Sequence, residues 1–371
     1  MPTCVNGNGK NPVCFKKEDL MSITKKFLIV ILCSLMAVSV VQYSIINKEK
    51  NENIPMESEE SGQIKSDKPF KVGIVLSIGG LGDKSYNDLA YEGTRLAQEK
   101  LGIEYSYIEP ATSIETEKEF GAYHLRQYAK EDYDLVIATG FLFKDACEQV
   151  SKEFPDVKFV IIDSVVSAPN VTSLTFKTNE GSFLVGAVAG MVTKTNTIGY
   201  IGAQDTDIFR EFQKGYEQGA VYVNPDVKIS SRMVDGENPF AVPNRGYELA
   251  NELIDQNADV VYTVAGSTGI GAIEACKEKG VYAIGVDNDQ DYIAKGTVIT
   301  SMMKRIDTAV YTTIELAVKG ELEPGTLEFN IANGGIDTSE FNYTRDKLPA
   351  DALEKLAQIK KDIISGKIEL N

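Results

Sequence analysis

A glycine-rich turn holds the first residues that could bind a ligand. The stretch SIGGLGDKSYND, Ser77 to Asp88, joins the apolar segment FKVGIV to a segment with helical spacing. It is close to a phosphate-binding P-loop, but Asp83 stands where that loop needs a glycine before Lys-Ser. A carboxylate there would repel the phosphate that helix amides attract. We therefore expect Asp83 to cap the helix by accepting from the backbone N–H of Ser85 or Tyr86.

Glycines in two strand-to-helix turns could let a ligand approach the backbone. In the first turn these are Gly79 and Gly80. The second turn, VYTVAGSTGIGAIEAC, has glycines at 266, 269 and 271 and resembles a dinucleotide-binding fingerprint. The spacing is not G-x-G-x-x-G, and the segment comes late in the chain. We expect Gly266 to shape a cleft for another kind of ligand.

The sequence offers little for catalysis and nothing for nucleic acid. The single histidine, His124, lies mid-helix among surface-like residues, so a histidine-based triad or metal site cannot be built. No G-x-S-x-G elbow occurs, although paired carboxylates leave a two-carboxylate glycosidase open. The 54 acidic residues outnumber the 38 basic ones, which disfavours a nucleic-acid partner. We predict a binding protein without cofactor or metal, and not an enzyme.

Polar residues follow nearly every predicted strand. In open α/β sheets, ligands bind beyond the carboxyl ends of the strands. Carboxylates, amides and hydroxyls gathered there suit a polyhydroxylated small molecule, although any one carboxylate is more often a cap. The residues in question are Ser77 with Asp83, Gly140 with Phe141, Asp163, Gln204 with Asp205, Gly266 to Thr268, Asp287 with Asp289, and Ser301 to Lys304.

The elements that position these residues alternate between strand and helix from Phe70 onward. One βα series ends at KFVIIDS, and a second begins after NVTSLTFKTNEG. Two such series predict an α/β protein with two doubly wound parallel-sheet lobes and a hinge, rather than one overlong sheet. We place lobe 1 at about 70–178 plus about 298–322. Lobe 2 takes about 179–297 plus the C-terminal section, which ends in a helix near 349–365.

The N-terminal part predicts a membrane attachment. Residues 27–46, FLIVILCSLMAVSVVQYSII, form an uncharged run long enough to cross a bilayer, and Lys25 and Lys26 precede it. By the positive-inside rule, 1–26 is the cytoplasmic or n-region, and the part after the flexible linker 47–69 lies outside. Cleavage, lipidation at Cys33 and the start at Met1 or Met21 stay open. We expect Cys147 and Cys276 to be buried, unpaired thiols.

Four motifs in this order resemble the basic membrane protein family of solute-binding proteins. They are GGLGDKSYND, EGSFLVGAVAG, GVDNDQ and TSMMKR, and the resemblance runs from about Phe70 to about Tyr343. The best-understood members of the family are purine nucleoside receptors, similar to purine nucleoside receptor A, that serve ABC transporters. The resemblance implies the type I periplasmic-binding fold, with two α/β lobes joined by three crossovers.

The resemblance also implies a binding site. The family clamps a purine between two aromatic rings and holds its ribose with carboxylates and a lysine. The positions that match are Tyr86 and Phe240 for the rings, with Phe212 as the alternative second ring, and Asp163, Asp287 and Lys304 for the sugar. Asn87 matches a position that we expect to be structural. This chain departs from the family at Ser77, where an aspartate is common, and at Gly82, where an asparagine is frequent.

These observations predict an extracytoplasmic receptor, anchored to the cell membrane, that captures a nucleoside between two lobes. It would pass the nucleoside to an ABC permease for import. The alternative is a membrane-anchored sensing or regulatory protein of the same fold without a transport role. Which nucleoside binds is not fixed by the sequence.

Overall fold

A computed structural model describes residues 3–5, 13–15, 68–109 and 113–370. The chain divides into two compact units, Met1–Ser66 and Asp67–Asn371. The first contains an antiparallel pair of short strands, β1 (Thr3–Val5) and β2 (Val13–Phe15). The predicted membrane segment 27–46 and most of the predicted linker lie outside the described residues. Within the described ranges, no helix combines the length and apolarity that a membrane crossing requires.

The first lobe of the larger unit has a six-stranded, wholly parallel sheet. Its strands lie in the order β13-β7-β6-β5-β3-β4. The central strands are runs such as LVIA and KFVII, buried on both faces, as expected for a parallel sheet between helices. The bounds are β3 (Lys71–Val75), β4 (Glu104–Ile108), β5 (Leu135–Ala138), β6 (Lys158–Ile162), β7 (Val171–Phe176) and β13 (Gly325–Phe329).

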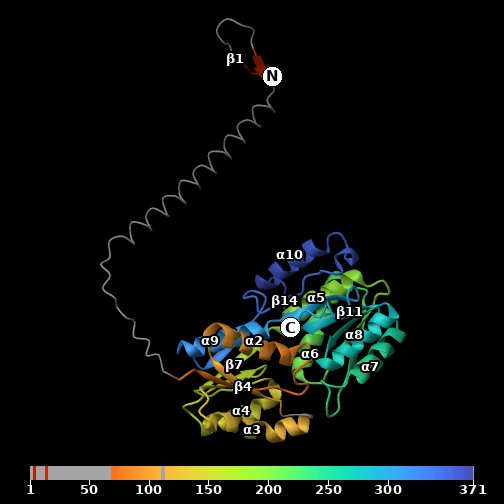
Figure 1. Cartoon of the computed structure of the whole chain (residues 1–371). Coiled ribbons are helices and arrows are strands. Elements are labelled where there is room, and N and C mark those ends of the chain that lie inside the picture. The colour runs from red at the N-terminus through yellow and green to blue at the C-terminus, as the bar shows by residue number, and fades with distance from the viewer. Residues whose placement is uncertain (1–2, 6–12, 16–67, 110–112, 371) are drawn as a thin grey trace. The chain divides into compact units, whose positions relative to one another are not determined.

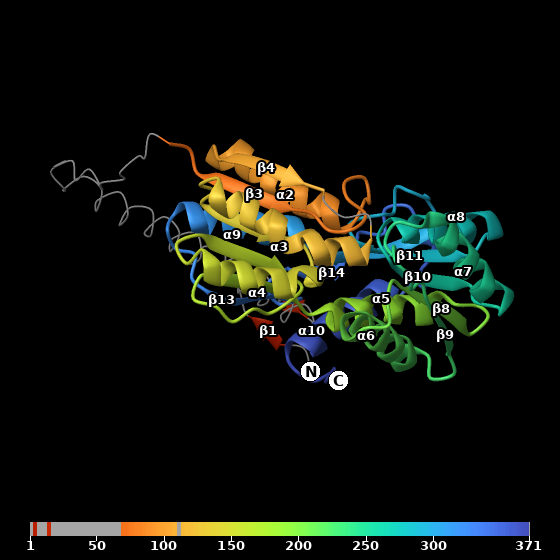
Figure 2. The ribbon, with the colours of Figure 1, turned by 90° about the horizontal axis from the view of Figure 1, so that it is seen from below.

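Helices cover both faces of this sheet (Figure 2). On one face α2 (Tyr86–Leu101) packs against α9 (Ile306–Val318). On the other face α3 (Ile114–Lys130) packs against α4 (Lys144–Glu153). The short helix η1 (Phe141–Phe143) directly precedes α4 in the chain. Alternate strand residues supply the two cores: Ile74 and Ile137 face one, Val75 and Val136 the other. Cys147 in α4 and Cys276 in lobe 2 are free and buried, which confirms that prediction.

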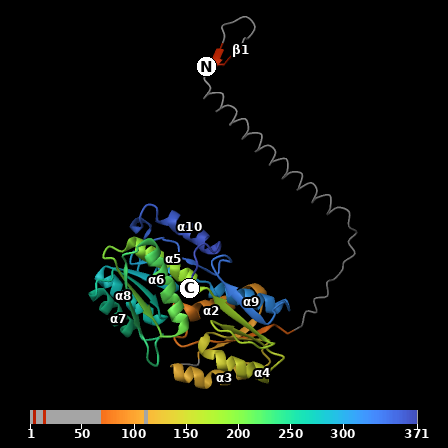
Figure 3. The same ribbon diagram turned by 180° about the vertical axis from the view of Figure 1, so that it is seen from behind.

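The second lobe repeats this arrangement. Its sheet runs β14-β12-β11-β10-β8-β9 and is parallel except for β14. Helices α5 and α6 pack together, as do α7 and α8, while α10 lies beside α5 (Figures 1 and 3). The bounds are β8 (Thr197–Gly202), β9 (Lys228–Met233), β10 (Val260–Val264), β11 (Tyr282–Asp287), β12 (Val298–Lys304), β14 (Ile336–Thr338), α5 (Thr178–Val192), α6 (Asp207–Val223), α7 (Pro243–Asp255), α8 (Ser267–Lys279), η2 (Arg345–Lys347) and α10 (Ala352–Ile364).

The chain crosses between the lobes three times. The crossings follow β7 at Lys177, β12 at Arg305 and β13 within 330–335. The two-lobe α/β fold is as predicted, but the division at 298–322 is wrong in detail. Strand β12 pairs in parallel with β11 of lobe 2, and β13 extends lobe 1 to Phe329. Strand β12 is buried at nearly every position, so its sequence alone does not indicate which sheet it joins.

Candidate functional site

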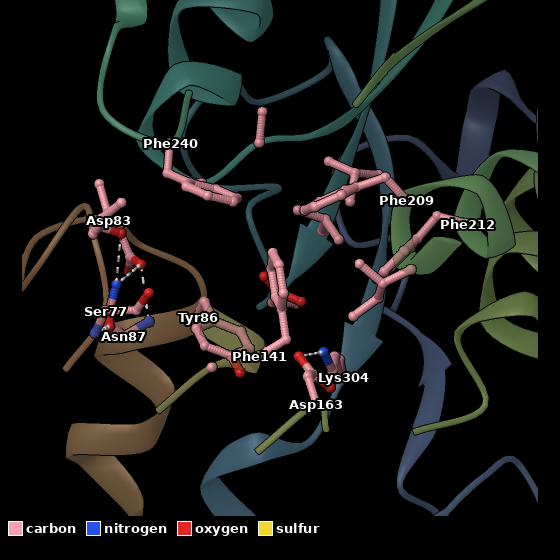
Figure 4. A pocket seen from close by; sticks show the side chains of 18 residues that line it. Ser77, Asp83, Tyr86, Asn87, Phe141, Asp163, Phe209, Phe212, Phe240 and Lys304 are labelled. Carbon is pink, nitrogen blue, oxygen red and sulfur yellow. Dashed lines mark hydrogen bonds and ion pairs between the residues drawn. The ribbon is translucent and has the colours of Figure 1, made fainter. Parts of the chain in front are cut away.

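Strand ends of the two lobes line one cavity of about 70 Å³ (Figure 4). All nine residues that the sequence predicted to bind the ligand lie around it, and the whole lining comprises eight positions of lobe 1 and ten of lobe 2. The predicted set is Ser77, Asp83, Tyr86, Phe141, Asp163, Phe240, Gly266, Asp287 and Lys304; the rest of the lining is Ile78, Asn87, Gly140, Ile208, Phe209, Phe212, Val264, Ala265 and Val286. The strand-end rule therefore brings these nine residues to a single place. Other strand-end residues named from the sequence do not line the cavity: Gln204, Asp205, Ser267, Thr268, Asp289 and Ser301.

Two of the aspartates that line the cavity occupy corresponding positions in the two sheets. Asp163 directly follows β6 and Asp287 ends β11, and each of these strands is third in its sheet order. Both residues have left-handed backbone angles, with φ of 61° and 63°. Aspartate tolerates this conformation better than most residues, since its short side chain can bond locally. The sharp turn after each strand directs a carboxylate into the cleft.

Glycine is required at the turn after β10. Gly266 has φ 54° and ψ −135°, a region that side chains rarely occupy. A Cβ atom there would lie 3.2 Å from the backbone oxygen of Phe240. The absence of a side chain at this position lets the Phe240 loop lie close to the strand end and places its ring at the cavity.

Asp83 caps α2, as the sequence predicted. Its carboxylate accepts from the backbone N–H of Ser85 at 2.9 Å and of Asn87 at 2.9 Å. The Asn87 side chain in turn accepts from the backbone N–H of Ser77 at 2.9 Å, so it holds the turn in place. Burial raises the pKa of Asp83 to about 6, against the lowering effect of these hydrogen bonds.

Gly79 and Gly80 serve the turn itself and not the cavity. Their φ angles are 104° and 56°, and neither residue lines the cavity. The approach of a ligand to the backbone at these two glycines stays a prediction, because in this arrangement neither of them borders the cavity. Their positive φ, which glycine adopts without strain, accounts for both residues. At Gly80 a Cβ atom would also collide with the Glu109 carboxylate.

An ion pair joins the two lobes at the cavity. The Lys304 ammonium lies 2.5 Å from an Asp163 carboxylate oxygen, and the two side chains are 2% and 7% exposed. The ammonium also lies over the Tyr86 ring, 5.0 Å from its centroid, which is a favourable cation–π position. Because Lys304 ends β12 of lobe 2 and Asp163 follows β6 of lobe 1, this pair forms only when the lobes are together.

Two further contacts link the lobes. The Ser85 hydroxyl donates to Asp287 Oδ2 at 2.6 Å, and the Gln290 amide donates to the Lys84 carbonyl at 3.2 Å. Burial raises the pKa of the Asp287 carboxyl, while the charge of Lys304 and the Ser85 hydrogen bond act in the opposite direction. Side chains that could hold a ligand thus bond to each other across the cleft.

The apolar part of the cavity is mostly aromatic. Figure 4 shows Phe240 and Tyr86 on different sides of the cavity, with Phe209 and Phe212 to one side. The Phe209 ring centroid lies 5.9 Å from that of Phe240 and 6.3 Å from that of Phe141. The Tyr86 hydroxyl is buried and has no hydrogen-bond partner among the described residues. Burial, followed by the neighbouring carboxylate of Asp163, raises the pKa of Tyr86 well above its usual value.

Sequence reasoning missed two residues that shape this site. Phe209 lines the cavity beside Phe212, and the spacing of the two rings in IFREF, three residues apart on one helix face, could have indicated both. Glu117 lies behind the wall, where its carboxylate accepts from the Ser77 hydroxyl and the Ile78 N–H. Nothing in its local sequence, one of several glutamates in α3, distinguishes it.

The cavity is built for binding, because flat rings face a group of hydrogen-bonding and charged side chains. No group of histidine, cysteine or acidic side chains suited to a metal ion occurs in the described part of the chain. Comparison with known proteins agrees with this interpretation. The family described as "ABC transporter substrate-binding protein PnrA-like" (Bmp) matches residues 70–371.

The chain belongs to this Bmp family. Similar proteins include the CD4+ T-cell-stimulating antigen of Listeria innocua, 32% identical over 85% of this chain and 91% of that protein. The ABC transporter nucleoside-binding protein BmpA of Lactococcus lactis is also 32% identical, over 83% of this chain and 90% of that protein. A solved ABC solute-binding protein from Aeropyrum pernix K1 superposes with a TM-score of 0.73 at 27% identity, covering 81% and 93% of the two chains.

Membership of the Bmp family confirms the resemblance found in the sequence motifs. The matched region reaches Asn371, beyond the section near Tyr343 where the motif resemblance ended. Bmp proteins bind substrates for ABC transporters and are not enzymes, as predicted. The chain is therefore a substrate-binding protein of the ABC transporter class.

Proposed function

We propose that this Bmp-family protein captures a purine nucleoside between its two lobes and delivers it to an ABC permease for import. The observation that carries the proposal is the meeting of aromatic rings, the carboxylates of Asp163 and Asp287, and the Lys304 ammonium at a single interlobe cavity. A purine needs apolar flat surfaces on its faces, and a ribose needs acceptors for its hydroxyl protons. The Lactococcus relative named as nucleoside-binding supports the same ligand class.

The base would lie between Tyr86 of lobe 1 and Phe240 of lobe 2. Both rings line the cavity, and Phe240 is half-buried, whereas Phe212 is 3% exposed and stacks against Phe209. This packing favours Phe240 over Phe212 as the second ring, because a ring already covered has less surface to offer a base. Aromatic stacking contributes about 0.5–1.5 kcal/mol beyond the area buried.

The sugar would be held by Asp287, Asp163 and Lys304. A ribose with neighbouring hydroxyls can donate two hydrogen bonds to one carboxylate, and charged partners make such bonds about twice as strong as neutral ones. The three groups now bond across the cleft to each other or to Ser85. A ligand hydroxyl could replace Ser85 as the partner of Asp287, and other hydroxyls could bond to the Asp163–Lys304 pair, whose two charges would stay paired with each other.

Closure about the crossovers is the proposed mechanism. Pockets for whole small molecules typically measure about 300–1,000 Å³, against about 70 Å³ here. The lobes must therefore separate to admit a nucleoside and then come together around it. The ligand contacts both lobes in the closed form and only one in the open form. It therefore stabilises the closed form by the difference between its binding free energies to the two forms.

The uncharged run at 27–46 supports anchoring of the protein on the extracytoplasmic face of the cell membrane. There the protein could contact a permease in the same membrane. Uptake of labelled nucleoside by cells with and without the gene tests this role. Equal uptake in both strains, together with tight binding in vitro, would favour a sensing or regulatory protein.

Isothermal titration of protein stripped of endogenous ligand tests the binding itself. We expect heat with at least one of adenosine, guanosine and inosine, less with uridine, and none with ribose alone. Asp287→Ala should abolish the signal. Asp205→Ala is the matched control, since this exposed carboxylate also follows a strand but does not line the cavity. A parent protein that gives no heat with any nucleoside refutes the ligand assignment.

A further inference from the structure

Behind one corner of the cavity lies a buried carboxylate that the proposed function does not use. Glu117, in the first turn of α3, is fully buried. One of its oxygens accepts from the Ser77 hydroxyl at 2.7 Å, and the other accepts from the Ile78 N–H at 2.7 Å. No lysine, arginine or histidine of the described ranges forms an ion pair with it. The carboxylate is thus held by hydrogen bonds to neutral donors and not by an opposite charge.

This arrangement fixes the direction of the Ser77 hydrogen bond. A serine hydroxyl has one proton and two lone pairs. The Ser77 proton is directed to Glu117, and the Ser77 backbone N–H is taken by Asn87. Because Ser77 lines the cavity, its oxygen can offer a ligand only lone pairs. The adjacent carboxylate makes that oxygen a stronger acceptor, since hydrogen bonds in a chain polarise one another.

We propose that Ser77 and Glu117 together form a donor-selecting corner of the cavity, which recognises a ligand N–H or O–H and disfavours an acceptor at the same place. Glu117 is the positioning residue, because it acts on the ligand through Ser77. The inference rests on the proposed nucleoside function and adds a specificity rule to it. The bound nucleoside must direct one of its hydrogen-bond donors at Ser77.

Substitution by glutamine would reverse this corner. In Glu117→Gln, the side-chain oxygen must face the Ile78 N–H, because two donors cannot bond to each other. The amide nitrogen would then donate to the Ser77 oxygen and leave the serine proton free to point into the cavity. The volume and the hydrogen-bond count stay the same, while the corner changes from acceptor to donor.

Protonation would have the same effect. Burial raises the pKa of Glu117 to about 7. The titratable side chain that its charge reaches from a neighbouring helix is Tyr86. A protonated Glu117 can donate to Ser77 as a glutamine would, so selection for a ligand donor should weaken as the pH falls through about 7. Asp83 titrates in both proteins, so the difference between the parent and Glu117→Gln isolates Glu117.

The test is a cycle of ligand and protein changes measured by titration calorimetry. The ligands remove one donor at a time: purine riboside lacks the base donors of adenosine and inosine, and 2′-, 3′- and 5′-deoxyadenosine each lack one hydroxyl. The proteins are the parent, Glu117→Gln, Ser77→Ala and the control Glu109→Gln. Glu109 accepts from the Leu81 N–H of the same turn but does not line the cavity.

We expect one donor whose removal weakens binding to the parent about tenfold, as a hydrogen bond of ordinary strength would. Removing the same donor should leave the affinity of Glu117→Gln and Ser77→Ala unchanged. In the control Glu109→Gln it should weaken binding about tenfold, as in the parent. Between pH 6 and 8 the parent's preference should rise, whereas that of Glu117→Gln should stay flat. The inference is overturned if every donor removal costs the same in Glu117→Gln as in the parent. An absence of nucleoside binding by the parent refutes the proposed function, and the inference with it.

Discussion

The pair formed by Lys304 and Asp163 is the contact between the lobes that a substitution can test most sharply. Both side chains are almost fully buried, with the ammonium 2.5 Å from the carboxylate. Removing one partner of such a pair leaves a lone buried charge and typically costs about 3–5 kcal/mol, whereas removing both charges together is often nearly neutral. We predict that Lys304→Met and Asp163→Asn each destabilise the closed arrangement by this amount.

The cost need not appear as unfolding. The two residues belong to different lobes, so opening the cleft returns the remaining charge to water without disrupting either sheet. A penalty of about 3 kcal/mol changes the ratio of closed to open molecules by a factor of more than about 100. Each single variant should therefore shift towards the open form.

Small-angle X-ray scattering and thermal unfolding of the two single variants and the double variant provide the assay. We expect a larger radius of gyration in each single variant and a return towards the parent in the double variant. The Lys355→Met variant serves as the control, because its pair with Asp351 is exposed to solvent and should contribute little to stability. Single variants that scatter and melt like the parent, or a double variant whose effect is the sum of the two, would refute the argument.

Three further predictions follow from the same geometry. Tyr86→Phe should bind nucleoside nearly as well as the parent because the hydroxyl has no partner to lose, while Tyr86→Ala should bind at least tenfold more weakly by calorimetry; equal affinity of the alanine variant would exclude stacking. Ser85→Ala removes the donor to Asp287 and should open the lobes measurably by scattering, with unchanged scattering as the contrary result. The folded-state pKa values of Asp83 and Glu117, about 6 and about 7, exceed the ordinary 3.8 and 4.5, so the folded protein holds extra protons. The free energy of unfolding should therefore fall as pH rises from about 4 to 7, by up to about 3 kcal/mol for Glu117 alone. Glu117→Gln should make the free energy of unfolding less dependent on pH. Urea titrations in which the free energy of unfolding rises over this range would contradict the prediction.

Much of this site could be predicted because the fold concentrates it at strand ends. Asp163 and Asp287 each close an apolar β-branched run, and parallel strands bring such ends to one edge of the sheet. The family resemblance, rather than periodicity, indicated Tyr86 as a cavity ring. From the local sequence alone, the first turn of α2 could equally have turned that ring into the core.

The parts that could not be predicted depend on how elements pack. Glu117 reaches the cavity wall only because α3 lies against the turn that carries Ser77, and no spacing within α3 encodes that contact. Strand β12 was assigned to the wrong lobe for a similar reason. Its burial on both faces fits either sheet, and only its hydrogen bonds to β11 decide between them.

A crystal structure with the purine nucleoside that gives the largest heat of binding tests the central claim most directly. We predict the base between the rings of Tyr86 and Phe240, and the ribose hydroxyls on Asp287 and Lys304, with both lobes in contact with the ligand. A nucleoside bound to one lobe alone, or at a site away from this cavity, would contradict the account.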